Sequence, residues 1–196
     1  MTDADHTANL TAACTAARLA FGAGSVSIAV ITPGGGDLSV DHLHYVAAEG
    51  RGSEGILGVR LPAGKGIASY VAATGQALVV DHVADDARFA RDVAERTGYV
   101  PTTLLAVPIT DRNGQVLGVL SVLDRGNSAG DALALGSAFA ATVAPLVASS
   151  TADRDAAPAE LPPQLAALEP EQRATVLDLL DGIIGAVQPR RRGRRD

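Results

Sequence analysis

A β-hairpin around Asn113-Gly114 is the feature that most constrains the fold of this chain. Asn-Gly between two apolar runs is a strong hairpin signal, and it predicts strands over residues 104–110 and 115–123. The second strand is apolar on both faces, so it belongs near the centre of a sheet with elements packed above and below. Pro108 has no backbone N–H to donate, so the first strand must be an edge strand or be bulged there.

The chain upstream predicts a helix followed by another hairpin. An Ala-rich helix is expected from Thr2 to about Phe21, with a narrow apolar stripe that includes Cys14. Alternating residues predict strands over 25–32 and 38–48, joined by the Pro-Gly turn at 33–37. The second strand should place Leu43, Tyr45 and Ala47 on one face, and residues 49–58 read as a Gly-rich loop.

Between the two hairpins lies a helical crossover. A short helix is predicted over 67–73, ended by Gly75 in a left-handed cap. A short buried strand over 77–80 follows, and Asp85 or Asp86 is expected to cap a helix that runs to Thr97. Such a crossover can lift away from a sheet and leave a pocket beneath it.

The C-terminal part predicts two further helices. Ser128 and Asp131 resemble a capping box for a helix over 129–148, in which Pro145 should introduce a kink or an end. The expected organisation is a domain over 1–148, a linker over 149–169, an amphipathic helix over 170–188 and a basic tail over 189–196.

Charge and cysteine content narrow the class of protein. The formal charge of the chain is −6, but the last seven residues, RRRGRRD, carry +4, so the rest of the chain carries −10. This negative charge argues against general nucleic-acid binding by the main domain. A single cysteine, Cys14, excludes an intramolecular disulfide and a cysteine-based zinc cluster. The start MTDADHTANL is not a secretion signal, and no apolar run approaches a membrane span, so we expect a soluble, cytoplasmic protein.

Three segments in this order resemble the GAF domain family. They are LPAGKGIASYVAATGQALVV from Leu61, DHVADDARF from Asp81, and VPITDRNGQVLGVLSVLD from Val107. The resemblance extends over roughly residues 11–148 and implies an α+β fold with an antiparallel sheet of five or six strands. It further implies that the N- and C-terminal helices pack on one face and that the crossover helices cover a small-molecule pocket on the other. It also implies regulation rather than chemistry, with homodimerisation through the terminal helices.

The known ligands of GAF domains can be compared with this sequence. Cyclic-nucleotide binders carry a spaced Asn-Lys-Phe-Asp-Glu signature, and although Lys65 and Phe89 are present the set does not assemble in order. Bilin binders need a thioether cysteine in or just ahead of the domain, whereas Cys14 lies on the first helix, outside the pocket segment. Haem-binding relatives place a histidine where this chain has Val100. The cofactor is therefore left unknown.

One relative of the GAF family is an enzyme that reduces free methionine sulfoxide. It needs a cysteine that is attacked and a second that resolves the intermediate, and this chain has only Cys14. An enzyme of another kind would need polar groups such as Asp81, His82 and Asp85 to gather in one cleft with shifted pKa values. We therefore expect no catalytic residues.

Candidate ligand-binding residues cluster in and just after the crossover. Three of the six aromatic residues fall there and could line a cavity, although filling the core is their commoner role. Polar residues at strand ends could face the same pocket, although turn and capping roles are the commoner alternatives. The predicted pocket residues are Tyr70, Asp81, His82, Phe89, Tyr99, Thr102 and Thr103.

Two further arrangements point to weaker sites. His42 and His44 lie on one side of a strand and could share a metal, but no third ligand at useful spacing is evident, so no metal site is predicted. Lys65 lies between Gly64 and Gly66 before a helix, a modest anion site whose spacing is not that of a phosphate-binding loop.

The sequence as a whole favours a non-catalytic sensory or regulatory module in signal transduction, acting on an unidentified small molecule through dimer or partner contacts. The alternative is an interaction scaffold with a vestigial pocket, which would hold a protein partner through the helix over 170–188 and the Arg-rich tail. That tail would also suit nucleic acid or an anionic membrane, while a solvated terminus is the simpler interpretation.

Overall fold

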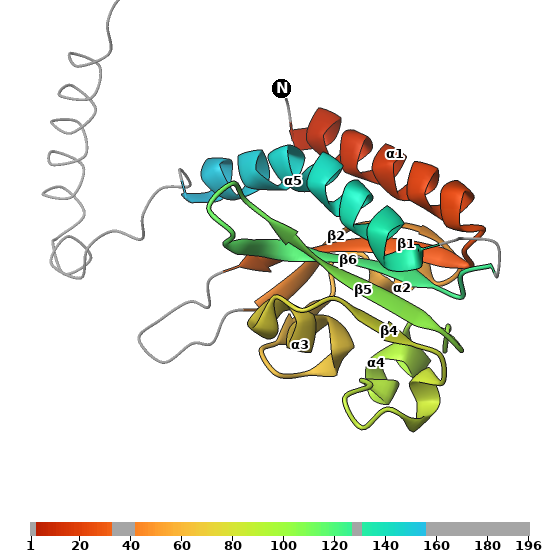
Figure 1. The fold of residues 1–196 in the computed structure, drawn as a ribbon. Coiled ribbons are helices and arrows are strands. Elements are labelled where there is room, and N and C mark those ends of the chain that lie inside the picture. Colours follow the sequence, from red (N-terminus) through yellow and green to blue (C-terminus); the bar gives the residue numbers. More distant parts are fainter. Residues whose placement is uncertain (1–2, 33–41, 127–130, 156–196) are drawn as a thin grey trace, which may run out of the picture. The chain divides into compact units, whose positions relative to one another are not determined.

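The computed structural model describes residues 3–32, 42–126 and 131–155 and shows a six-stranded antiparallel sheet in the order β3-β2-β1-β6-β5-β4 (Figure 1). Helices α1 and α5 lie over one face, and the crossover with α3 and α4 lies on the other (Figure 1). The elements are α1 (Asp3–Phe21), β1 (Ser25–Thr32), β2 (His42–Gly50), α2 (Ser53–Ile56), β3 (Arg60–Pro62), α3 (Gly66–Thr74), β4 (Leu78–Val80), η1 (Val83–Asp85), α4 (Arg91–Arg96), β5 (Leu104–Thr110), β6 (Val116–Leu123) and α5 (Ala132–Asp155). This confirms the expected α+β architecture.

Two hydrophobic cores lie on the two faces of the sheet. The helix-side core joins α1 and α5 to alternate residues of the central strands, among them Val26, Leu120 and Val122. The crossover-side core contains the intervening residues of the same strands, such as Ala29 and Val119, together with residues of α3 and α4. Because successive side chains of a strand point to opposite faces, β1 and β6 contribute to both cores.

The predicted hairpin around Asn113-Gly114 is confirmed as β5 and β6, and β6 is a central strand between β1 and β5. Its turn is longer than a two-residue Asn-Gly connection, because the backbone N–H of Asp111 donates to the carbonyl of Gln115 at 2.9 Å. The Asp111 carboxylate accepts hydrogen bonds from the backbone N–H groups of Asn113 and Gln115, and Gly114 takes the left-handed conformation.

Pro108 does not make β5 an edge strand. β4 pairs with β5 only from Leu104 to Ala106, so Pro108 lies past the end of β4, where its missing N–H leaves no ladder position unfilled. The predicted irregularity is nearby, as a register shift between Ile109 and Thr110.

A bulge between β1 and β2 corrects the expected faces of β2. The register passes from Ile28 opposite Ala47 to Ala29 opposite Tyr45, so Val46 is the extra residue. Ala47 therefore joins the helix-side core, while Leu43 and Tyr45 lie in the crossover-side core. Strict alternation wrongly placed all three on one face, because it does not allow for an inserted residue.

The crossover differs from the predicted one in three places. The segment expected to be a loop contains the short helix α2, and β4 is an edge strand with Val79 exposed, not a buried one. The predicted cap residue Asp86 accepts a hydrogen bond from the backbone N–H of Arg88 instead, so a turn precedes the short helix α4. The left-handed Gly75 that ends α3 is as expected.

Helix α5 begins and ends differently from the expectation. The Asp131 side chain accepts a hydrogen bond from the backbone N–H of Ala134, so Asp131 itself caps the helix, and Ser128 lies outside the described residues. Pro145 lies inside the helix, and both Pro145 and Ala141 are exposed, so water can solvate the carbonyl that proline leaves without a partner. Residues 149–155 continue the helix where composition predicted a linker.

Several expectations lie outside the described residues. These are the turn at 33–37, the start of the second predicted strand, the linker after residue 155, the amphipathic helix over 170–188 and the basic tail. The predicted domain boundaries stay predictions. Among the helices that the structure describes, none combines the length and the apolar character needed to cross a membrane.

Candidate ligand-binding site

A partly open cavity of about 100 Å³ lies between the crossover and the sheet face opposite α1 and α5. Five strands and helices α2, α3 and α4 contribute residues to it, so it occupies the position at which a pocket was expected. Its lining consists of Ser25, Tyr45, Arg51, Gly52, Ile56, Leu61, Gly66, Ile67, Ala68, Phe89, Ala90, Val93, Ala94, Thr97, Tyr99, Pro101, Leu104, Ser121 and Leu123.

The floor of the cavity is open because small serines stand where large side chains would fill the sheet. Ser25 of β1 and Ser121 of β6 are both buried, on strands whose other residues are mostly apolar. The hydroxyl of Ser25 donates to the carbonyl of Glu49 at 3.1 Å. Tyr45 of β2 is also buried and lines the cavity, and burial raises the pKa of its phenol to about 12.

The roof of the cavity is apolar. Ile67 and Ala68 come from the first turn of α3, and Val93 and Ala94 come from α4, while Phe89 precedes α4. Apart from the half-buried Phe89, these side chains are buried. Ile67, Ala68 and Val93 belong to the crossover-side core, and Phe89 packs against it. A ligand's apolar part would replace water against this surface.

One wall of the cavity is the ring of Tyr99, which packs against backbone from two other segments. A Cβ added at Gly24 would lie 2.5 Å from the Tyr99 hydroxyl, and one added at Gly52 would lie 2.8 Å from the Tyr99 Cβ. Both glycines are therefore needed for the ring to fit. The Tyr99 hydroxyl donates a hydrogen bond to the Asp124 carboxylate. The pKa of Tyr99 is raised to about 12, mainly by burial and to a smaller extent by this hydrogen bond.

Asp124 holds together the ends of the crossover and of β6. Its Oδ1 accepts hydrogen bonds from the backbone N–H groups of Thr102 at 2.7 Å and Thr103 at 2.9 Å, and its own N–H donates to the Thr103 carbonyl. It adopts a positive φ of 50°, which is uncommon for a residue other than glycine. The carboxylate thereby satisfies the backbone where the chain enters β5.

The single charged residue among the described lining residues is Arg51. Its guanidinium carbon lies 5.8 Å from the centre of the Tyr99 ring. Arg51 is exposed and yet lines the cavity, so it stands at the rim. No Asp or Glu lines the cavity among the described residues, so the site as a whole is neutral to positive.

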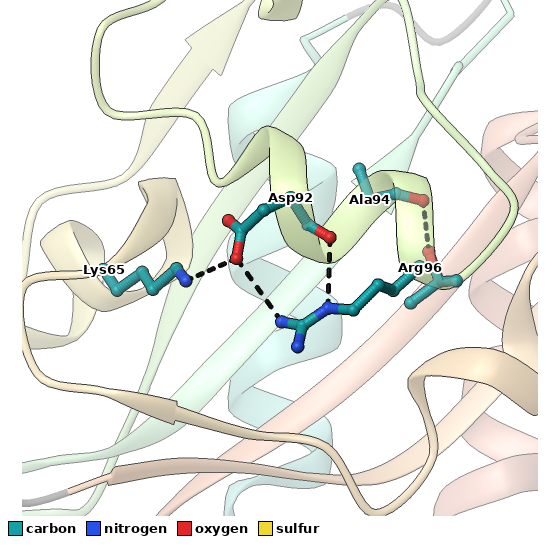
Figure 2. Close-up of polar contacts among 5 residues, drawn as sticks. Lys65, Asp92, Ala94 and Arg96 are labelled. Carbon is teal, nitrogen blue, oxygen red and sulfur yellow. Dashed lines mark hydrogen bonds and ion pairs between the residues drawn. The ribbon is translucent and has the colours of Figure 1, made fainter.

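The roof helices are joined on their outer side by an ion pair. Figure 2 shows Lys65, just before α3, and Arg96 of α4 both approaching Asp92. Lys65 Nζ lies 2.6 Å and an Arg96 guanidinium nitrogen 3.4 Å from Asp92 Oδ2, and the Lys65 hydrogen bond lowers the pKa of Asp92. Lys65 is therefore engaged by Asp92, which disfavours its use as an anion site.

A second contact joins α3 to the turn that follows η1. The Arg88 guanidinium donates to both oxygens of the Asp86 carboxylate, at 2.9 and 2.6 Å, and lies 4.8 Å from the centre of the Tyr70 ring. The Arg88 hydrogen bonds lower the pKa of Asp86. Tyr70 thus faces outward on the crossover.

Among the predicted pocket residues, the structure brings Phe89 and Tyr99 together at the cavity. Tyr70, Asp81, His82, Thr102 and Thr103 do not line it. Asp81 is exposed and forms an ion pair with Arg125 at 3.2 Å, and His82 is exposed. The two threonines contribute backbone N–H groups to the Asp124 carboxylate.

Five polar residues of the lining were not predicted from the sequence: Ser25, Tyr45, Arg51, Thr97 and Ser121. Ser121 carried a usable signal, since an isolated serine in a strand as apolar as β6 indicates space or a polar contact. Ser25 carried a weaker one, because Ser27 lies on the same face of β1. Arg51 carried none, because it lies in a Gly-rich loop. Across the described residues no three His, Cys, Asp or Glu side chains come close enough to hold a metal ion.

The sequence over residues 5–147 matches the family model of the GAF domain. The chain belongs to the GAF domain family. Curated relatives include a probable 3',5'-cyclic phosphodiesterase of Caenorhabditis elegans, 42% identical over 73 residues, which are 37% of this chain and 10% of the relative. A dual 3',5'-cyclic-AMP and -GMP phosphodiesterase 11A of Takifugu rubripes is 34% identical over 70 residues, 36% of this chain and 8% of the relative. This GAF chain thus spans a tenth or less of these relatives.

Solved structures show the same fold. The GAF domain of a Coxiella burnetii phosphoenolpyruvate-protein phosphotransferase superposes with a TM-score of 0.59 at 19% identity, covering 76% of this chain and 84% of that one. A type II free methionine-R-sulfoxide reductase of Thermoplasma acidophilum gives a TM-score of 0.56 at 16% identity, covering 74% and 93%. At such identities the likeness is one of fold alone.

Proposed function

We propose that this GAF domain is a non-catalytic regulatory module of signal transduction that binds a small molecule under its crossover. The observation that carries the proposal is the cavity of about 100 Å³. Phe89 and Tyr99 line this cavity and do not fill it. A cavity with apolar walls and a few polar groups is the usual form of a small-molecule site. A cytoplasmic location remains a prediction from composition.

The size of the cavity limits the ligand. An engineered protein cavity of about 150 Å³ holds benzene, so about 100 Å³ suits a ligand of similar or smaller size unless the crossover opens. A cyclic nucleotide is much larger than benzene. The phosphodiesterase relatives match this GAF chain over a tenth or less of their length, so we do not extend their catalysis or their nucleotides to it.

A non-catalytic role is supported by where the reactive residues lie. Cys14, the single cysteine of the chain, is buried in the helix-side core, across the sheet from the cavity, and burial raises the pKa of its thiol to about 12. Cysteine chemistry of the kind used by methionine sulfoxide reductases therefore lacks a nucleophile at this cavity. Asp81, His82 and Asp85 are exposed and do not line it.

The sheet offers a route from ligand to output. Ser25 and Ser121 face the cavity, while their strand neighbours Val26 and Val122 pack against α1 and α5. We propose that a ligand shifts the packing of these helices and that α1 and α5 contact a second copy or a partner. The exposed Leu19 of α1 and Leu133 of α5 support such a contact.

A ligand screen with a cavity-filling variant tests the proposal. Thermal-shift screening of a diverse small-molecule library should identify compounds that stabilise the wild-type protein. Ala68→Leu, which fills the cavity from α3, should abolish stabilisation, whereas Ala73→Leu, on the exposed side of the same helix, should not. Circular dichroism checks that both variants remain folded. If no compound binds, or if Ala68→Leu retains binding, the cavity is not the site.

The alternative function is an interaction scaffold with a vestigial pocket. Its support is the apolar stripe over residues 170–188 and the five arginines of the tail, which lie outside the described residues. Deletion of residues 164–196 should then abolish partner capture in a pull-down while the body stays folded. Unchanged capture would rule out this alternative.

A further inference from the structure

Two side-chain hydroxyl groups without a partner among the described residues belong to residues that line the cavity. Tyr45 is 8% exposed and Ser121 is 4% exposed, and both line the cavity. Neither side chain makes a hydrogen bond within the described residues. Their oxygen atoms are not sealed from solvent, so both hydroxyls are open to the cavity. A polar molecule that enters the cavity can therefore hydrogen-bond to them in place of water.

The register of the sheet puts these two hydroxyl-bearing residues near each other. Ser121 of β6 lies opposite Ser27 of β1, and Tyr45 of β2 lies opposite Ala29, two residues further along the same strand. Residues two apart on a strand share a face. Tyr45 and Ser121 therefore rise from the same face of three adjacent strands, and both line the cavity.

The charge of the lining selects among ligands. Arg51 is the single charged residue among the described lining residues, and the nearby Asp124 carboxylate already accepts hydrogen bonds from Tyr99, Thr102 and Thr103. An ammonium group would thus meet Arg51 and no acidic side chain. An anion would gain a charge-assisted interaction with the guanidinium. The site disfavours amines and zwitterionic amino acids.

We infer that the ligand is a short-chain carboxylate: an anionic head that meets Arg51 and the hydroxyls of Tyr45 and Ser121, and a branched or short apolar tail that packs against Ile67, Phe89 and Val93. The volume of about 100 Å³ sets the size of the tail. This inference rests on the proposed function, because it names the ligand class of the same cavity.

Four probes that share an isopropyl group separate the ligand classes. Isobutyrate is the anion, isobutyramide its neutral isostere, isobutylamine a cation and valine the zwitterion. Each is titrated to millimolar concentration, as suits a ligand with few atoms, while the backbone amide resonances of the full-length protein are followed by NMR. Isobutyrate should shift the amides of Ser121 and its neighbours and bind at least about tenfold more tightly than the other three.

Two matched variants assign the charge effect to the cavity. Arg51→Gln should weaken isobutyrate binding about tenfold or more, because it removes the cation at the rim. Arg112→Gln makes the same charge change in the exposed hairpin loop, away from the cavity, and should leave the dissociation constant unchanged. Tyr45→Phe and Ser121→Ala should each weaken the binding of isobutyrate. Each should weaken the binding of isobutyramide to a different extent.

The outcomes distinguish this inference from the proposed function. Equal binding of isobutyramide or isobutylamine, or no effect of Arg51→Gln, would overturn the carboxylate assignment. If isobutyrate fails to bind while the library screen yields a ligand that Ala68→Leu excludes, the carboxylate assignment fails and the regulatory function stands. If neither the probes nor the library bind, both fail.

Discussion

The Tyr99 hydroxyl donates a hydrogen bond to the Asp124 carboxylate, which joins the end of the crossover to the end of β6. The same carboxylate accepts from the backbone N–H groups of Thr102 and Thr103. One side chain therefore both positions the ring that forms a cavity wall and satisfies the backbone at the entry to β5. Loss of Asp124 should affect stability and the binding site together.

Replacement of Asp124 tests this double role. Asp124→Ala should lower the free energy of unfolding by about 2–3 kcal/mol, because it removes a charged acceptor of three hydrogen bonds and puts alanine at a positive φ. Asp124→Asn keeps an acceptor oxygen and tolerates the left-handed conformation, so it should cost about 1 kcal/mol. Urea denaturation measures both. Equal effects of the two variants would contradict the roles assigned to the acceptor oxygen and the left-handed conformation.

Gly24 lies against the same hydroxyl group. A Cβ at Gly24 would lie 2.5 Å from the Tyr99 hydroxyl but 3.4 Å from the Asp124 Cβ, an ordinary contact. Gly24→Ala should therefore destabilise the protein by about 1–3 kcal/mol, through overpacking against Tyr99. In a Tyr99→Phe background, which lacks the hydroxyl, the same substitution should cost about 1 kcal/mol less. A double-mutant cycle measures this coupling, and strictly additive effects would contradict it.

Much of the fold followed from local sequence patterns. The Asn113-Gly114 hairpin and the doubly apolar β6 predicted a central strand, and Gly75 predicted the end of α3. These features depend on backbone conformation and residue periodicity, which a sequence shows directly. The bulge beside Tyr45 was not predicted, because an inserted residue leaves no compositional mark and yet changes the face of every residue beyond it.

The sequence predicted the position of the cavity but only some of its lining residues. Phe89 and Tyr99 were expected there because large rings in a crossover either fill or line the space beneath it. Tyr70 was expected with them, but it turns outward against Arg88. Arg51 comes to the rim through the positions of Gly50 and Gly52, whose positive φ angles turn the loop. Such a path is set by tertiary packing, so sequence spacing did not predict it.

The ion pair between Lys65 and Asp92 should control opening of the roof more than overall stability. Exposed ion pairs contribute little to the free energy of unfolding, so Asp92→Asn should leave the urea midpoint nearly unchanged. It should nevertheless speed amide hydrogen exchange at Val93 and Ala94 of α4 several-fold, because it releases α4 from the start of α3. Asp85→Asn, at another exposed carboxylate of the crossover, is the control. Unchanged exchange in Asp92→Asn would show that apolar packing alone holds the roof.

Three groups with raised pKa values should make the protein sensitive to alkaline pH: the buried Cys14 and Tyr45 and the half-buried Tyr99. Burial raises the pKa of Cys14 from 9.0 to about 12, and that of Tyr45 from 10.0 to about 12. Burial, with the Asp124 hydrogen bond, does the same for Tyr99. Each group therefore keeps its proton in the folded protein over a range in which the unfolded chain loses it.

Stability should accordingly be complete below pH 9 and should fall as pH rises from about 9 to about 12, since the folded state there binds more protons than the unfolded state. Tyr45→Phe removes one of these groups and should make the decline shallower by up to about 2 kcal/mol over pH 10–12. Tyr70→Phe removes the hydroxyl of an exposed tyrosine and is the matched control. Urea denaturation at a series of pH values measures the slope. If stability stays level to pH 12, or if the two substitutions have equal effects, the Tyr45 phenol is accessible to hydroxide in the folded state. The floor of the cavity would then be open to water.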